Sequence, residues 1–150
     1  MEAVKKYLEK GEENASTIDG LPLRFFEPLV MQGLHVDLVE PGRIVCSFTV
    51  PTRLLNSGNI LHGGATATLV DLVSSAVTFT LGAPATGVSV EINVSYLDAA
   101  YAGDEIEIEA KALRVGKAIG VISVELKKKK TGKIVAQGRH TKYLAVPSKL

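Results

Sequence analysis

The chain has 150 residues and a formal net charge of +1, from 17 basic and 16 acidic residues. Hydrophobic residues make up 46% of the sequence and charged residues 22%. This composition predicts a single globular domain over residues 1–150 and excludes both a disordered chain and a nucleic-acid-binding protein that depends on bulk positive charge. The single Cys46 excludes an intramolecular disulfide and a multi-cysteine metal site, and no metal or organic cofactor is predicted.

Residues 1–33 predict a short helix followed by a covering segment. Residues 2–10 fit a helix, a polar stretch follows, and the apolar segment 21–33 is interrupted by two prolines. That segment predicts irregular structure or one helical turn lying over the core. The charged, amphipathic N-terminus differs from a secretory signal, so we expect a reducing or redox-neutral compartment, where Cys46 is a small buried hydrophobic residue.

Alternation of apolar and polar residues predicts six strands separated by turn residues. The predicted strands are a hairpin of 34–39 with 43–50, and then 88–97, 105–114, 120–127 and 133–146. In the third strand the alternation places Val88, Val90, Ile92, Val94 and Tyr96 on a core face and Ser89, Glu91, Asn93 and Ser95 on a polar face. The last four strands follow one another as an antiparallel meander.

The run from Leu54 to Val90 contains no Lys, Arg or Glu and a single Asp, Asp71. Within it, residues 64–81 lack proline and strand alternation, which predicts a long helix that is apolar nearly all round. Its many Thr and Ser residues argue against a membrane span. A sheet of six strands buries such a helix only by curving around it. The predicted fold is therefore α+β, a hotdog fold in which a curved antiparallel sheet wraps one long central helix.

Two features of this helix suggest a catalytic site. His62-Gly63-Gly64 lies at its N-terminus, where two glycines leave backbone N–H groups free to stabilise developing negative charge. Asp71 follows Gly63 by eight residues, so the two groups lie about 12 Å apart along the axis. One chain cannot easily bring both to one carbonyl group. If they act together, Asp71 comes from a second subunit whose helix runs antiparallel, in a twofold dimer with two shared sites. Asp71 could also be purely structural.

Each of three further polar residues has two possible roles. Asn56 could donate to a carbonyl group or only form a turn, and His62 could be a base or only hold the loop. Ser89 could orient a water molecule or only cap its strand. The basic residues Lys128, Arg114 and Lys117 lie at hairpin turns and could bind phosphate groups.

The chain ends in Ser148-Lys149-Leu150, which matches a peroxisomal address read by an import receptor. Pro147, just before it, ends the last strand pattern. We therefore expect a peroxisomal protein, with a cytoplasmic one as the fallback.

The stretch from Asn56 through Leu61-His62-Gly63-Gly64 to Asp71 resembles the small hotdog-fold acyl-CoA thioesterases, of the animal thioesterase superfamily member 2 and bacterial phenylacetate-pathway types. Residues 87–90 and 131–142 are also similar to that family. The resemblance implies that Gly63 supplies an oxyanion-hole N–H and that Asp71 of the partner subunit is the base or nucleophile. It further implies that Asn56 polarises the carbonyl group or positions water, that Ser89 binds that water, and that His62 fixes the loop.

The resemblance also implies a homodimer or a homotetramer built as a dimer of dimers, with Gly64 in the substrate site and CoA phosphates near Arg114, Lys117 and Lys128. The predicted function is hydrolysis of fatty or aromatic acyl-CoA to the free acid and CoA, a step in lipid metabolism. Two alternatives remain: a hydratase or other lyase on the same fold, and a non-catalytic acyl-CoA-binding protein.

Overall fold

The computed structural model describes residues 1–145 and confirms the α+β architecture, so the predicted address Ser148-Lys149-Leu150 lies outside the described part. Its strands are β1 (His35–Glu40), β2 (Arg43–Thr49), β3 (Val88–Tyr96), β4 (Glu105–Val115), β5 (Ile119–Lys128) and β6 (Ile134–Tyr143). They form one antiparallel sheet in the order β1-β2-β4-β5-β6-β3. Every strand predicted from alternation is present, within a few residues at each end. The predicted meander of the last four strands is wrong for β3, which pairs with β6 instead of β4 and forms one edge of the sheet.

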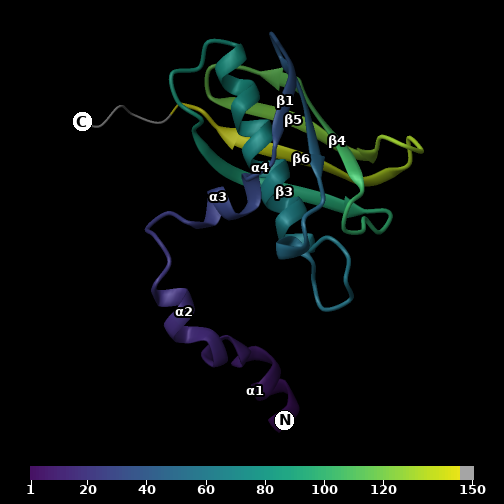
Figure 1. The fold of residues 1–150 in the computed structure, drawn as a ribbon. Coiled ribbons are helices and arrows are strands. Elements are labelled where there is room, and N and C mark those ends of the chain that lie inside the picture. Colours follow the sequence, from purple (N-terminus) through teal and green to yellow (C-terminus); the bar gives the residue numbers. More distant parts are fainter. Residues whose placement is uncertain (146–150) are drawn as a thin grey trace.

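The long helix α4 (Gly63–Thr80) lies across the concave face of this sheet (Figure 1). It packs against β2 through β6. The sequence of α4 favours a helix because it contains no proline. The helix ends just before Gly82, whose left-handed backbone conformation (φ +86°) is one that residues with a β-carbon rarely adopt. No helix in residues 1–145 is both long and apolar enough to cross a membrane.

The core lies between α4 and the inner face of the sheet. Its largest fully buried side chains include Phe48, Leu69, Ile106, Ile122 and Leu126. One side of α4 stays partly exposed, along a stripe that runs through Thr68, Asp71, Leu72, Ala76 and Phe79. The helix is therefore buried on the sheet side alone, whereas the sequence predicted burial nearly all round.

The N-terminal third of the fold differs most from the prediction. After α1 (Glu2–Leu8), the stretch expected to be merely polar forms a 3₁₀ turn, η1 (Lys10–Asn14), and α2 (Ala15–Asp19). These elements extend away from the body in Figure 1. The predicted single helical turn is α3 (Phe26–Met31), which packs on α4 and buries Val30. Within the segment 21–33, α3 is thus the part that lies on α4. A second 3₁₀ turn, η2 (Thr52–Leu54), leads toward α4.

Candidate active site

The N-terminus of α4 is held by its own first residues. His62 is the N-cap, and its Nδ1 accepts the Gly64 N–H at 2.8 Å. The cap therefore uses the amide of Gly64 and leaves that of Gly63, which the helix itself does not bond, as a donor at the positive end of the helix dipole. This places His62 as the residue that fixes the loop. It also occupies the N–H through which Gly64 was predicted to contact substrate.

The loop before the helix is fixed by Asn56. Its side-chain oxygen accepts the N–H groups of Gly58 (2.9 Å) and Ile60 (3.2 Å). With the oxygen occupied in this way, the side-chain amide can contribute only its NH₂ donors to a ligand. A donor is what a carbonyl oxygen requires, so both roles considered for Asn56 coexist in one side chain.

Tyr96, near the end of β3, is a contact that the sequence did not predict. Its hydroxyl donates to the Gly63 carbonyl oxygen at 2.8 Å, and its ring lies 3.4 Å from where a Gly63 β-carbon would be. Tyr96 therefore ties the glycine turn to the edge of the sheet and fixes the plane of the peptide group there.

Asp71 lies further along α4, in a pocket of about 420 Å³. The pocket is lined by Glu27, Asp71, Leu72, Ser75, Ala76, Phe79, Thr86, Gly87, Ser89 and Lys142. The side chain of Asp71 is 41% exposed and His140 lies near it. The uncharged sequence around Asp71 had suggested a buried, isolated carboxylate, and the structure shows neither. The structure thus brings two of the predicted residues, Asp71 and Ser89, to one pocket.

Beneath this pocket lies a buried polar network that the sequence analysis missed. His140 of β6 is fully buried, and its Nδ1 lies 2.6 Å from Ser74 Oγ while its Nε2 lies 2.8 Å from Ser89 Oγ. Ser74 Oγ donates its proton to the Val70 carbonyl oxygen at 2.5 Å. It must therefore accept from His140 Nδ1, which leaves the Nε2 lone pair to accept the Ser89 hydroxyl proton. The oxygen of Ser89 is then an acceptor toward the pocket.

The predicted polar-face position of Ser89 is wrong. A β-bulge between Ser89 and Glu91 inserts one residue into β3 and reverses the alternation there. Ser89 consequently pairs with Lys142 and faces α4, in phase with Ile92, instead of sharing the outer face with Glu91. The predicted core face of β3 is also largely exposed, because β3 is the edge strand: Val88, Val90, Ile92 and Tyr96 are all exposed in the single chain.

The two halves of the predicted site do not meet within one chain. The Gly63 N–H and Asp71 lie on one rigid helix, about 12 Å apart along its axis. Residues beside His62 line a separate pocket of about 200 Å³, which includes Phe26, Arg53 and Gly64. One chain therefore presents a donor half-site at the start of α4 and a carboxylate half-site at its middle.

The three basic residues predicted for CoA phosphates separate into two places. Arg114 and Lys117 line one pocket at the turn between β4 and β5. Lys128 lies at the opposite end of β5, where its Nζ is 3.7 Å from an Asp98 oxygen and 3.5 Å from an Asp104 oxygen. Arg114 and Lys117 are thus the pair that one ligand could contact together.

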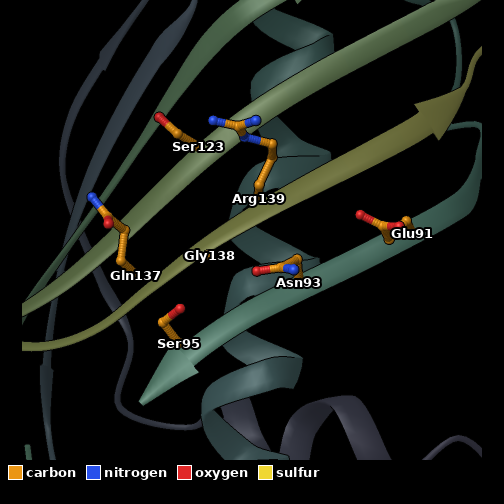
Figure 2. A pocket seen from close by; sticks show the side chains of 7 residues that line it. All are labelled: Glu91, Asn93, Ser95, Ser123, Gln137, Gly138 and Arg139. Atoms are coloured by element: carbon orange, nitrogen blue, oxygen red, sulfur yellow. The ribbon is translucent and has the colours of Figure 1, made fainter. Parts of the chain in front are cut away.

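Two other features lie apart from these half-sites. A groove of about 300 Å³ lies on the sheet face away from α4, and polar residues that include Glu91, Asn93 and Arg139 line it (Figure 2). None of the predicted site residues contributes to it. Cys46 is buried, and burial raises the pKa of its thiol to about 11, in agreement with its prediction as a small hydrophobic residue.

Comparison with known proteins connects this arrangement to a family. The family model described as "Thioesterase superfamily" matches residues 58–135, which span the glycine turn, all of α4 and strands β3, β4 and β5. The chain belongs to the thioesterase superfamily. Human acyl-coenzyme A thioesterase 13 is 44% identical over 104 residues, covering 69% of this chain and 74% of that protein.

Solved thioesterase structures share the fold. Zebrafish thioesterase superfamily member 2 superimposes with a TM-score of 0.77 at 37% identity, over 88% of this chain and 94% of that one. A hypothetical thioesterase from Streptococcus pneumoniae, solved with coenzyme A, gives a TM-score of 0.75 at 23% identity, over 83% and 96% of the two chains. At that identity the second likeness shows the hotdog fold alone.

The buried imidazole of this thioesterase-superfamily chain makes stability depend on pH. Burial, and then the charge of Lys142, lower the pKa of His140 from its ordinary value of 6.5, while Asp71 opposes the shift. Below pH 6.5 the unfolded chain therefore binds a proton that the folded chain resists. We expect the free energy of unfolding to fall as pH decreases through and below 6.5, by at most about 1.4 kcal/mol per pH unit from this group.

Urea unfolding at fixed protein concentration, between about pH 8 and pH 5, measures this slope. His140→Gln should flatten it, whatever its effect on absolute stability, and His35→Gln, at an exposed position of β1, is the comparison for loss of an imidazole outside the core. An equal slope in His140→Gln would show that the buried imidazole is not its source.

Proposed function

We propose that the protein is an acyl-CoA thioesterase that hydrolyses acyl-CoA to the free acid and CoA. The observation that carries the proposal is that the Asp71 carboxylate and the Ser89 oxygen line one pocket, with the Ser89 proton directed to His140. Two acceptors in one pocket suit a water molecule, which has two protons to donate. Membership of the thioesterase superfamily and the 44% identity to a protein named acyl-coenzyme A thioesterase 13 support the same reaction.

In the proposed mechanism a water molecule donates one hydrogen bond to Asp71 and one to Ser89. Asp71 takes a proton as the water oxygen attacks the thioester carbonyl carbon. The resulting oxyanion accepts the Gly63 N–H and an Asn56 N–H, and then the C–S bond breaks and CoA leaves as the thiolate. Direct attack by Asp71 is the other route open to a carboxylate, but the orientation of Ser89 and His140 favours the water.

The proposed site is shared between two subunits. A rigid helix holds the Gly63 N–H and Asp71 about 12 Å apart, too far for both to contact one thioester group. The exposed stripe of α4 and the exposed apolar residues of the β3 edge supply surface that a second copy can cover. A twofold dimer, alone or as half of a tetramer, would place the two helices antiparallel and join each donor half-site to the partner's carboxylate half-site.

Two further pockets suit the two ends of an acyl-CoA molecule. An entirely apolar-lined pocket of about 250 Å³, including Val36, Ile44 and Val73, shares Leu72 and Ala76 with the Asp71 pocket. An apolar acyl group would gain free energy by leaving water for this space. Arg114 and Lys117 supply the paired positive charge that CoA phosphates require.

Replacement of Asp71 by Asn tests the proposed reaction. The amide keeps the size of the side chain but cannot take a proton, so the rate of thiol release from acyl-CoA should fall by about 10²- to 10⁴-fold. Thiol release is measured on short, long and aromatic acyl-CoAs, with Asp19→Asn on the exposed helix α2 as the matched control. Wild-type turnover that leaves the thioester intact would indicate a lyase, and tight binding without turnover would indicate a binding protein.

We also propose that the protein acts in peroxisomes, on the basis of Ser148-Lys149-Leu150. A tagged chain with an intact C-terminus should colocalise with a peroxisomal marker, and removal of the last three residues should disperse it. An unchanged distribution after removal would refute the address.

A further inference from the structure

Lys142 of β6 is a buried amine next to the proposed catalytic carboxylate. The residue is 3% exposed, and it lines the same pocket as Asp71 and Ser89. Lysine is almost never fully buried without a partner, because removing a charge from water is costly. The partners that this lysine finds therefore indicate why it is there.

Those partners form a relay with a fixed direction. Lys142 Nζ lies 2.7 Å from Ser75 Oγ, and Ser75 Oγ lies 3.3 Å from Asp71 Oδ1. An ammonium group can only donate, so Ser75 accepts from Lys142 and has its own proton to donate to the carboxylate. This arrangement engages Oδ1 of Asp71 and turns the carboxylate so that Oδ2 is the oxygen left for a water molecule.

The charges around Lys142 support the same pairing. The titratable groups that face it are Asp71 on α4, His140 on its own strand and Glu27 on α3, while β5 opposes it with Gly120. Burial lowers the pKa of Lys142, and the negative charge of Asp71 opposes that shift. Among the described residues that line this pocket, Lys142 is the cation that balances the carboxylate.

We propose that Lys142 is a positioning residue for thioester hydrolysis, which acts through Ser75 to hold the Asp71 carboxylate in its reactive orientation. The inference rests on the proposed thioesterase function and adds to it a residue that touches neither the water nor the thioester. It distinguishes two relays from adjacent serines of α4: Ser74 with His140 sets Ser89, and Ser75 with Lys142 sets Asp71.

The test compares Lys142→Met with Ser75→Ala in steady-state thiol release. Methionine keeps the buried aliphatic stem and removes the charge, and alanine at 75 cuts the relay while keeping the lysine. We expect Lys142→Met to lower kcat by about tenfold to a hundredfold, with KM within about twofold of wild type. The acid limb of its kcat/KM profile should move to higher pH, because loss of a nearby positive charge disfavours the carboxylate form. Ser75→Ala should lower kcat by about three- to tenfold.

The matched control is Lys111→Met, which removes a largely exposed amine on β4 and should leave kcat and the pH profile at wild-type values. A lysine that only stabilises the fold would lower the melting temperature of Lys142→Met but leave kcat per folded enzyme and the acid limb unchanged, and that result overturns the inference. If Lys142→Met does not fold, Ser75→Ala tests the inference alone, and a wild-type kcat in Ser75→Ala overturns the inference. Absence of thiol release by the wild type would instead overturn the proposed function.

Discussion

The length of one rigid helix constrains everything else in this molecule. Because α4 fixes the Gly63 amide and the Asp71 carboxylate about 12 Å apart, a single chain offers two half-sites and no complete one. The exposed stripe on α4 and the exposed apolar residues of the edge strand β3 are consistent with this constraint, because both form surface that a second chain can cover. In this account the geometry of the helix makes assembly a condition of catalysis.

The site depends equally on buried polar side chains between α4 and the inner face of the sheet, where few water molecules reach. Ser74 and Ser75 are adjacent on α4. Ser75 joins Lys142 of β6 to Asp71, whereas Ser74 binds His140 of β6, which in turn binds Ser89. Hydrogen bonds in such surroundings are stronger than in water, and an unpaired group there is costly. The network can therefore hold Asp71 and Ser89 in fixed orientations, at the expense of a stability that depends on pH through His140.

Periodicity predicted most of the fold, because α4 and the inner strands β2, β4, β5 and β6 bury a face that repeats along the sequence. It failed at Ser89, because a single bulged residue reverses every face before it. It also missed His140 and Lys142, although both alternate in phase with Ala136 and Gly138, which are buried on the inner face of β6. The helix predicted over residues 2–10 is present as α1, but the stretch that forms η1 and α2 carries no strong pattern and α2 buries no residue, so composition described that stretch only as polar.

Subunit mixing tests the shared site most directly. Gly63→Pro removes the donor N–H at the first helical position, which proline tolerates, and His62 already has the extended backbone (φ −61°, ψ 131°) that a following proline requires. Gly63→Ala, which keeps the N–H, is its control. Asp71→Asn and Gly63→Pro should each be inactive alone, but a refolded equimolar mixture should regain about a quarter of wild-type activity, because half the dimers then carry one intact site of two. A mixture no more active than its parents would contradict a site shared between subunits.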